Sequence, residues 1–396
     1  MLSKKAKAIN PSPTMAIENK AKELKSQGID VIGFGAGEPD FDTPVHIREA
    51  AIKAINEGHT RYTPASGTLE LKEAVCEKFK VDNGLEYSPA QIVVSNGAKH
   101  SLFNALAALL NPGDEVIIPV PYWVSYPELV KLNDGIPVTV ETGVNKNFKI
   151  SVEELEKHHT GKTKALILNS PVNPTGQVYS KEELKVIAEF CSKQDIYVIA
   201  DEIYEKLTYD GSQHISIATF GEQIKELTII VNGVSKSYAM TGWRIGYTAS
   251  TPEIAKVMGA LQSHATSNPN SVAQKAALSA LQGSQECVRE MNLAFDQRRK
   301  YMYEQIKAIP SFEALEPKGT FYLFVDIAKI IGKSFQGKAI GSSDDFARLL
   351  LDNQKVALVP GTGFGSVNYV RLSFATSMEN IVEGLNRIGS FVAELE

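Results

Sequence analysis

Short apolar runs alternate with helix-periodic segments from the start of the chain to about residue 250. The runs bounded by turn residues, which are typical of buried strands, are 92–95, 115–119, 165–169, 197–200 and 227–231. Amphipathic segments long enough to form helices stand between them. Strands that alternate with helices predict an α/β fold with a mostly parallel sheet, covered by helices on both faces.

Two segments carry recognisable helix starts. Ser180 and Glu183 have the spacing of a capping box, in which each side chain satisfies a backbone N–H near the other residue. Thr43 stands directly before Pro44, and this pair predicts a second helix that begins at the proline and is capped by the threonine.

The pattern changes from about residue 252 onward. Helix-periodic segments dominate as far as residue 309, and strand-like runs at 321–325, 357–359 and 370–374 follow, mixed with helical segments at 343–353 and 378–395. This mixture predicts a second, smaller α+β domain that an N-terminal helix at 14–27 joins. We therefore expect a large domain at residues 46–289, and a small domain made of residues 1–45 and 290–396.

The composition is that of an ordinary soluble protein. The chain has 396 residues, 43% hydrophobic and 22% charged, with a net charge of -5, so it lacks the basic surface that nucleic acid requires. No apolar run approaches the ~20 residues needed to cross a bilayer. Cys76, Cys191 and Cys287 are too few and too far apart for a disulfide framework or a zinc site. We expect a cytoplasmic protein that binds no metal, membrane or nucleic acid.

The segment 232–247 carries the most informative chemistry. Ser235, Lys236 and Arg244 follow the apolar run 227–231 within a glycine-rich stretch. An amine at the end of a strand, with a hydroxyl and a guanidinium nearby to hold a phosphate, is what the Schiff base of pyridoxal 5'-phosphate (PLP) requires. The alternative interpretation is that Lys236 is one more solvated lysine.

Further candidates for a PLP site stand at the ends of other runs. Asp201 follows the run 197–200, where open α/β sheets place ligands, and its carboxylate suits the pyridine nitrogen. Tyr204 and Asn173 can donate to the phenolic oxygen, and Trp123 can stack on the ring. Taken singly, each has a structural alternative: a helix cap for Asp201, a turn for Asn173 and a core position for Trp123.

A phosphate and a carboxylate also need partners. Gly97, Ala98 and Lys99 open a helix directly after the run 92–95, and backbone N–H groups at a helix start favour an anion. We expect Ser235 and Arg244 to complete this phosphate site. Arg371, in the run 370–374, suits the two oxygens of a substrate α-carboxylate.

Together these residues resemble the class I aminotransferases of PLP fold type I over essentially the whole chain. The stretch 233–246 is similar to the lysine signature of that family, and 35–41, 121–127 and 170–176 are similar to the bacterial and archaeal aspartate aminotransferase subgroup. The resemblance implies a mostly parallel seven-stranded sheet in the large domain, a small domain that closes on substrate, and a homodimer with shared active sites. It also implies that Tyr62 reaches the phosphate of the neighbouring subunit, and that Gly37 and Asn173 help Trp123 and Arg371 hold the substrate.

The resemblance also implies a substrate. Lys99 is similar to the lysine that contacts the distal carboxylate of aspartate or glutamate in this subgroup. We therefore expect transfer of the amino group of L-aspartate to 2-oxoglutarate, giving oxaloacetate and L-glutamate by a ping-pong mechanism. Aromatic amino acids, alanine or prephenate are the alternative substrates, although Asn10 replaces the basic residue of some prephenate-using relatives. A PLP lyase, or a regulator that binds PLP without turnover, are further alternatives on the same fold.

Overall fold

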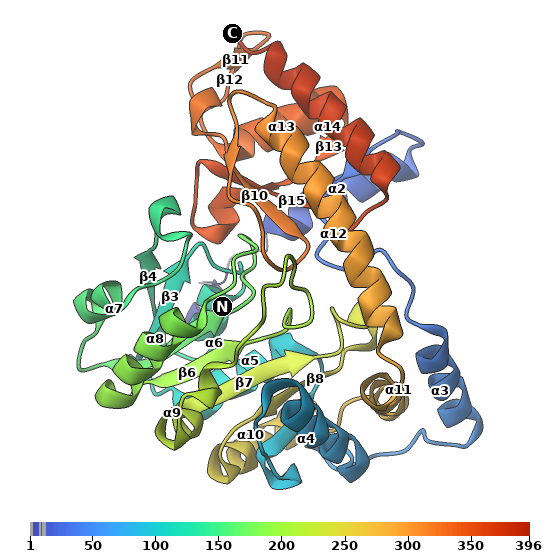
Figure 1. Ribbon diagram of the computed structural model, residues 1–396, viewed down its shortest axis with the longest axis vertical. Helices are drawn as coiled ribbons and strands as arrows, with labels where there is room; N and C mark the ends of the chain where they lie inside the picture. The colour runs from blue at the N-terminus through green and yellow to red at the C-terminus, as the bar shows by residue number, and fades with distance from the viewer. Residues whose placement is uncertain (1–2, 8, 10–12) are drawn as a thin grey trace.

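A seven-stranded sheet forms the centre of the larger unit (Figure 1). The strand order is β2-β8-β7-β6-β5-β3-β4, and of these seven strands β8 alone runs in the direction opposite to the other six. This confirms the mostly parallel sheet expected from the alternation of strands and helices. The strands span Ile92–Ser95 (β2), Glu115–Val120 (β3), Ile136–Glu141 (β4), Thr163–Asn169 (β5), Tyr197–Asp201 (β6), Thr228–Gly233 (β7) and Gly246–Ala249 (β8).

Helices cover both faces of this sheet because successive strand residues point to opposite sides. Ile167 and Ile199 pack in one layer with α5, α6 and α10, whereas Leu168 and Val198 pack in the other with α7, α8 and α9. Helices α3, α4 and α11 extend this second layer beside β2, β7 and β8. The helices span Val45–Asn56 (α3), Leu69–Asn83 (α4), Ala98–Leu109 (α5), Tyr126–Leu132 (α6), Val152–His158 (α7), Lys181–Gln194 (α8), Glu222–Leu227 (α9), Pro252–Ala265 (α10) and Ser271–Gln282 (α11).

The two expected helix caps have different outcomes. Ser180 accepts a hydrogen bond from the backbone N–H of Glu183, whose carboxylate accepts one from the N–H of Ser180, so the capping box is confirmed. The prediction that Thr43 caps α3 is wrong. Its hydroxyl donates to the carbonyl of Ala239 at 2.7 Å and accepts from the indole of Trp243 at 2.9 Å. Thr43 instead ties the start of α3 to the loop that follows Lys236.

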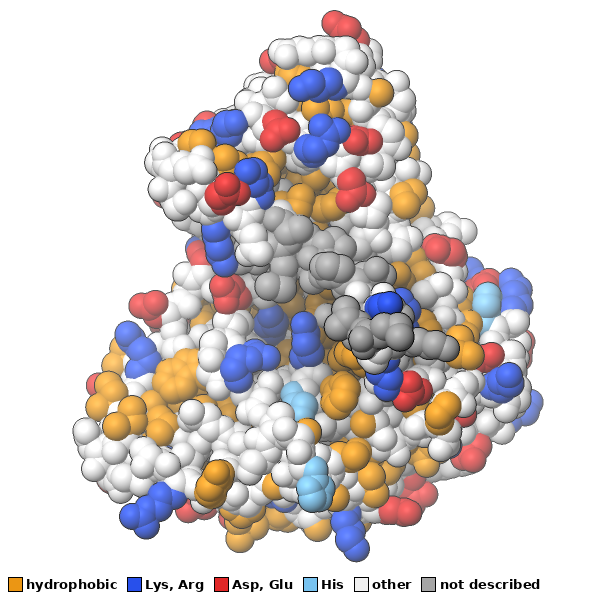
Figure 2. Space-filling view, turned by 180° about the vertical axis from the view of Figure 1, so that it is seen from behind, with side chains coloured by type: hydrophobic (Ala, Val, Ile, Leu, Met, Phe, Trp, Pro, Cys, Tyr) orange, Lys and Arg blue, Asp and Glu red, His pale blue; other side chains and the backbone are white. Residues whose placement is uncertain are grey.

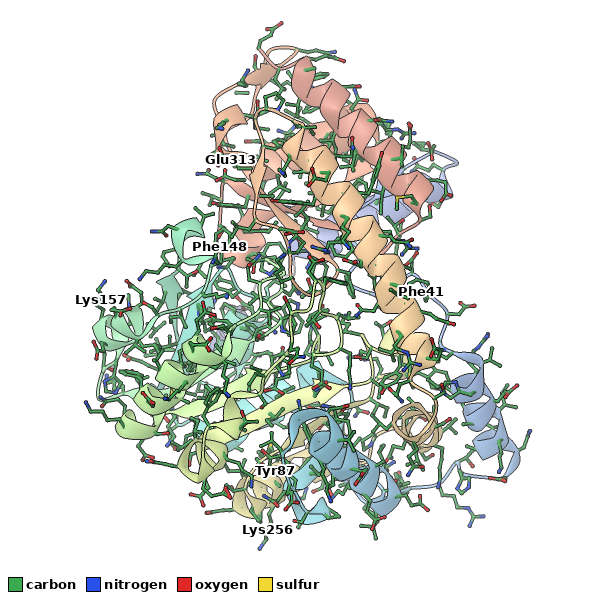
Figure 3. All side chains as sticks on the ribbon, viewed as in Figure 1. Phe41, Tyr87, Phe148, Lys157, Lys256 and Glu313 are labelled. Atoms are coloured by element: carbon green, nitrogen blue, oxygen red, sulfur yellow. The ribbon has the colours of Figure 1, made fainter. Side chains whose placement is uncertain are left out.

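A smaller unit lies above the sheet in Figure 1 and contains an antiparallel sheet in the order β14-β15-β10-β9. The long helix α12 runs between the two units, and Phe41 packs edge to face on its Phe295 (Figure 3). The elements span Lys4–Lys7 (α1), Pro13–Ser26 (α2), Ile32–Gly33 (β1), Glu286–Lys307 (α12), Glu313–Ala314 (β9), Tyr322–Asp326 (β10), Ser334–Phe335 (β11), Lys338–Ala339 (β12), Ser343–Gln354 (α13), Val356–Ala357 (β13), Val359–Pro360 (β14), Tyr369–Ser373 (β15) and Met378–Ala393 (α14).

The core of the smaller unit reaches into the larger one. Ile203, Tyr204 and Leu207, in the loop after β6, belong to the same apolar cluster as β10, β15 and α14. Figure 2 shows that the molecule narrows where the two units meet. The computed structural model describes residues 3–7, 9 and 13–396, so Asn10 lies outside the described residues. Within those ranges, every helix is too short or too polar to pass through a bilayer.

Candidate active site

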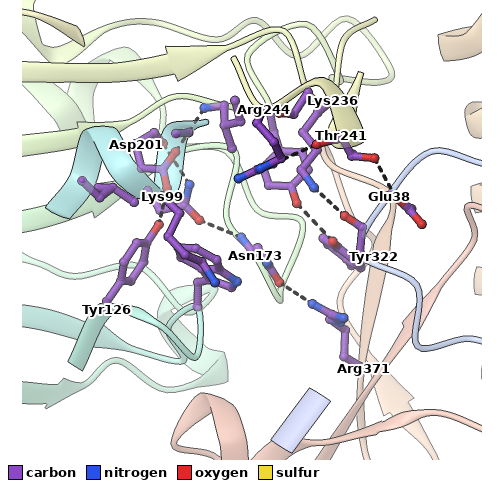
Figure 4. A pocket seen from close by; sticks show the side chains of 18 of the residues that line it. Glu38, Lys99, Tyr126, Asn173, Asp201, Lys236, Thr241, Arg244, Tyr322 and Arg371 are labelled. Carbon is purple, nitrogen blue, oxygen red and sulfur yellow. Dashed lines mark hydrogen bonds between the residues drawn. The ribbon is translucent and has the colours of Figure 1, made fainter. Parts of the chain in front are cut away.

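A cavity of about 550 Å³ lies between the carboxyl ends of the central strands and the smaller unit (Figure 4). It brings together all but two of the predicted site residues. Its lining consists of Gly35, Gly37, Glu38, Ala98, Lys99, Leu102, Trp123, Tyr126, Asn169, Asn173, Asp201, Ile203, Tyr204, Ser235, Lys236, Thr241, Arg244, Tyr322 and Arg371.

Asp201 is a buried carboxylate at the base of the cavity. It is the last residue of β6, and its Oδ2 accepts a hydrogen bond from the hydroxyl of Tyr126 at 2.7 Å. Burial raises its pKa to about 6, and the Tyr126 hydroxyl opposes that rise. Across the described part of the chain, no lysine or arginine forms an ion pair with it. The site therefore holds a negative charge that is ready for a cationic ligand group.

A chain of hydrogen bonds connects the sheet edge to the smaller unit. The side-chain amide of Asn169 donates to the carbonyl of Asp201 at 2.9 Å, and its oxygen accepts from the N–H of Asn173 at 2.8 Å. Arg371 Nη1 then donates to Oδ1 of Asn173 at 2.9 Å. Asn169, Asp201 and Arg371 lie on β5, β6 and β15, and Asn173 lies in the turn after β5, so the fold itself fixes the distance between Asp201 and Arg371.

Arg371 is a buried cation without an anion. It is 3% exposed, its Nη2 donates to the carbonyl of Gly35 at 3.1 Å, and its Nε is buried with no hydrogen-bond partner. Its guanidinium lies over the ring of Tyr322, with 4.1 Å between Cζ and the ring centroid. Among the residues that the structure describes, no carboxylate pairs with it. An unpaired buried charge is costly, so the arrangement favours an anionic ligand.

The amine of Lys236 lies in the same cavity and is affected by both charges. Lys236 follows β7 in a tight loop, and its Nζ donates to the carbonyl of Gly37. Loss of hydration, followed by the positive charge of Arg371, lowers its pKa to about 8. A neutral amine is the form that attacks carbonyl carbon or accepts a proton, so this environment raises its reactivity at neutral pH.

The other end of the cavity is suited to a phosphate. Helix α5 begins at Ala98, and the first N–H groups of a helix lack intrahelical partners. Gly97 itself is buried just behind the lining, and a Cβ at this position would collide with the guanidinium of Arg244. Ser235 adds a hydroxyl. This donor set, with a guanidinium held against a helix start, is typical of phosphate sites.

Lys99 and Trp123 form one wall. The Lys99 amine lies 4.9 Å from the centre of the Trp123 ring, and Trp123 packs edge to face on Tyr126. Loss of hydration and the charge of Arg244 lower the pKa of Lys99. The wall therefore presents a flat aromatic face with a cation beside it.

Tyr62 lies apart from these residues. It is 90% exposed and does not line the cavity of its own chain. Its expected role concerns a neighbouring subunit.

The sequence interpretation missed five polar lining residues: Glu38, Tyr126, Asn169, Thr241 and Tyr322. Glu38 accepts a hydrogen bond from the hydroxyl of Thr241 at 2.6 Å, and so links the N-terminal segment to the Lys236 loop. Asn169 is the last residue of a predicted strand, and this position was a usable signal. Tyr322 was hidden inside a predicted strand, because only the pairing of β10 with β15 places it beside Arg371.

The geometry defines a ligand with two charged ends. These ends are a cation that faces Asp201 and a carboxylate that faces Arg371, and a third group, an anion, is suited to the start of α5. An electrophilic carbon near Lys236 would meet its amine. The cavity volume falls within the range of small-molecule sites.

Comparison with known proteins gives a consistent result. Residues 29–388 match the family model "Aminotransferase class I and II". The chain is 52% identical over 391 residues to an aspartate aminotransferase of Bacillus subtilis (strain 168), covering 99% of this chain and 98% of that relative. It is 46% identical over 395 residues to an aspartate/prephenate aminotransferase of Nitrosomonas europaea, covering 99% of this chain and all of that one.

Solved structures agree with the sequence matches. The aspartate aminotransferase from Rhizobium meliloti superposes with a TM-score of 0.96 at 41% identity, and the two chains cover each other completely. The aspartate aminotransferase from Thermus thermophilus with maleate has a TM-score of 0.93 at 42% identity, with 99% of each chain covered. The chain therefore belongs to the aminotransferase class I and II family.

Proposed function

We propose that the protein is a PLP-dependent aspartate aminotransferase, which converts L-aspartate and 2-oxoglutarate into oxaloacetate and L-glutamate by a ping-pong mechanism. One observation carries the proposal. Asp201 and Arg371 are buried charges of opposite sign in one cavity, neither of them in an ion pair with any described residue, and the amine of Lys236 lines the same cavity. The names of the relatives from Bacillus subtilis and Rhizobium meliloti support aspartate as the donor.

The residues present fit PLP. Asp201 suits the protonated pyridine nitrogen, and the start of α5 with Ser235 and Arg244 suits the phosphate. Trp123 offers a ring face, while Tyr204 and Asn173 lie where they can donate to the phenolic oxygen. When bound, PLP supplies a protonated ring that takes up the electron pair left at the substrate Cα.

The chain's own residues perform the remaining tasks. Arg371 binds the α-carboxylate through its planar guanidinium, and Gly37 and Asn173 help to hold the substrate. Lys99 binds the distal carboxylate beside Trp123. Lys236 would attach the cofactor and then move the proton from the substrate Cα onto the cofactor, and in the second half of the reaction it would move a proton from the cofactor to the Cα of the new amino acid.

We further infer a homodimer that works in the cytoplasm. Helix α3 and the segment after it expose apolar side chains, with Val45 57%, Ile52 58%, Ile55 55% and Tyr62 90% exposed. Such a surface is typical of a covered interface, and its exposure supports a role for Tyr62 at a partner's phosphate site. Three free cysteines suit a reducing compartment.

We propose that residues 46–289 hold the cofactor, and that residues 1–45 and 290–396 close on the substrate.

Aromatic amino acids, alanine and prephenate are the competing substrates. The Nitrosomonas europaea relative is named for both aspartate and prephenate, which supports prephenate as a second acceptor. Lys99 favours substrates with a distal carboxylate, since a buried carboxylate needs a cation.

A donor panel tests the proposal. The PLP-loaded enzyme is supplied with 2-oxoglutarate and, in turn, with aspartate, alanine, phenylalanine and tyrosine, while glutamate formation is followed. We expect the highest kcat/KM for aspartate. A preference for phenylalanine over aspartate would overturn the assignment of the substrate, and absence of turnover with every donor would overturn the activity itself.

A further inference from the structure

Tyr322 connects two parts of the cavity that the proposed function uses separately. It lies on β10 in the smaller unit and is 1% exposed. Its hydroxyl oxygen lies 3.1 Å from the hydroxyl oxygen of Tyr204, and its ring carries the guanidinium of Arg371 at 4.1 Å (Figure 4). The Tyr322 hydroxyl also lies beside the N-terminal segment, since a Cβ built at Gly37 would be in ordinary van der Waals contact with it at 3.5 Å.

The direction of the hydrogen bond between the tyrosines follows from their surroundings. Each hydroxyl has one hydrogen, so only one of the two can donate to the other. If Tyr204 gives its hydrogen to the phenolic oxygen of PLP, its own oxygen is left to accept from Tyr322. Throughout the described ranges, the Tyr322 hydroxyl hydrogen-bonds to Tyr204 alone. The hydrogens therefore order as a relay from Tyr322 to Tyr204 to the cofactor.

We propose that Tyr322 is a positioning residue that couples the occupation of Arg371 by a substrate carboxylate to the hydrogen bond that Tyr204 donates to the cofactor. The inference rests on the proposed function, because it requires PLP in the cavity. It adds to that function a route by which carboxylate binding at Arg371 changes the hydrogen bond from Tyr204 to the cofactor.

The coupling has an electrostatic basis. Burial raises the pKa of Tyr322, and the nearby Arg371 charge opposes this rise. Burial also raises the pKa of Tyr204 well above its usual range, and Arg371 again acts in the opposite direction. A cation that acidifies a hydroxyl strengthens it as a donor. Because hydrogen bonds in a chain reinforce one another, a strong Tyr322 donor strengthens the bond that Tyr204 makes.

Substrate binding reverses this effect. A carboxylate bound to Arg371 neutralises the charge over the Tyr322 ring, so the donors along the relay weaken. The negative phenolic oxygen of the cofactor then loses stabilisation. Protonation of the nitrogen atom that Lys236 contributes therefore becomes more favourable. Binding of a substrate carboxylate at Arg371 thus raises the proton affinity of the Lys236 nitrogen.

The pH dependence of the visible absorbance of the PLP-loaded protein tests this relay. Tyr204→Phe should raise the pH midpoint by about one unit, and Tyr322→Phe by about half a unit, because each weakens the stabilisation of the phenolic oxygen. The double variant should match Tyr204→Phe alone. Tyr238→Phe is the control, since the Tyr238 hydroxyl donates to Gln285 at 2.8 Å outside the cavity, and its midpoint should equal that of the wild type. Circular dichroism establishes that each variant is folded.

A second arm uses maleate as an unreactive dicarboxylate. Maleate should raise the midpoint of the wild type, and the rise should be smaller in Tyr322→Phe because only the route through Asn173 remains. A Tyr322→Phe midpoint equal to that of the wild type, alongside a shifted Tyr204→Phe, would overturn the relay. So would additive shifts in the double variant. A wild type without a pH-dependent visible band or without transamination would instead overturn the proposed function.

Discussion

Arg371 and Asn173 are joined by a hydrogen bond of 2.9 Å that crosses from the smaller unit to the edge of the central sheet. The guanidinium is thereby held in one orientation, while its Nε has no hydrogen-bond partner among the described residues. A carboxylate that enters the cavity completes a site that the fold has already organised.

Arg371 and Lys99 should affect different substrates. Arg371→Ala should lower kcat/KM at least about 100-fold for every donor, because every amino acid has an α-carboxylate and a buried charge would lose its partner. Lys99→Ala should lower kcat/KM for aspartate and glutamate by about 10- to 100-fold and spare phenylalanine. Lys185, an exposed lysine of α8, provides the control as Lys185→Ala. An unchanged ratio of aspartate to phenylalanine in Lys99→Ala would show that this lysine does not select the distal carboxylate.

Asp201 should make the binding of PLP sensitive to pH. Its pKa of about 6 means that, as the pH falls through 6, the cofactor-free protein loses the charge that holds the pyridine nitrogen. The dissociation constant of PLP, measured by equilibrium dialysis from pH 5 to 8, should therefore rise on the acid side. Tyr126→Phe removes a hydrogen bond to the carboxylate. The pH below which the dissociation constant rises should therefore increase by about half a unit or more. Coincident curves for Tyr126→Phe and the wild type would contradict the role of Tyr126.

The strands and most of the charged site could be predicted because their signals are local. Asp201 ends a continuous apolar run, and Gly97 stands between a second apolar run and a helix. The sequence next to each residue is therefore enough to predict its place at the end of a strand. Strands β4 and β8 escaped prediction: β4 lies at the edge of the sheet and is largely exposed, and β8 has only four residues and begins at a glycine. Thr43 carried a valid capping signal, but two tertiary hydrogen bonds to the loop after Lys236 overrode it.

The remaining site residues depend on contacts between distant segments. Tyr322 becomes part of the site only through strand pairing with β15, and Glu38 only through its contact with Thr241. Neither carries a local pattern that differs from that of an ordinary strand or loop residue. Physical reasoning on one sequence finds the groups at strand ends, whereas the groups that support them require the fold.

Lys236 should destabilise the cofactor-free protein at neutral pH. Its pKa in the folded protein is about 8, below its usual value of 10.5, so the unfolded chain binds more protons between these values. Stability should therefore rise as the pH increases from 8 to 10.5. At pH 7, Lys236→Met should increase the free energy of unfolding by about 3 kcal/mol, and the gain should shrink towards pH 10. Urea titrations at pH 7 and 9.5, with Lys185→Met as the control, measure this. A gain that does not change with pH would point to packing instead.

Tyr62 should act across a subunit interface. Mixing Lys236→Ala with Tyr62→Phe subunits places both lesions in one site of the heterodimer and leaves the other site intact. Refolded one-to-one mixtures should recover about a quarter of the wild-type activity if sites are shared in a two-fold dimer. Lys236→Ala mixed with Arg371→Ala should recover nothing, because both residues line the cavity of the same chain. If the first mixture recovered no activity, Tyr62 would act in the active site of its own subunit.

Transfer of the nitrogen atom itself tests the central claim most directly. The PLP-loaded protein is given ¹⁵N-labelled aspartate and unlabelled 2-oxoglutarate, and the products are analysed by mass spectrometry. The account predicts ¹⁵N-glutamate and oxaloacetate in equal amounts from the wild type, and neither from Lys236→Ala. Failure of the wild type to form ¹⁵N-glutamate, or equal formation by Lys236→Ala, would contradict it.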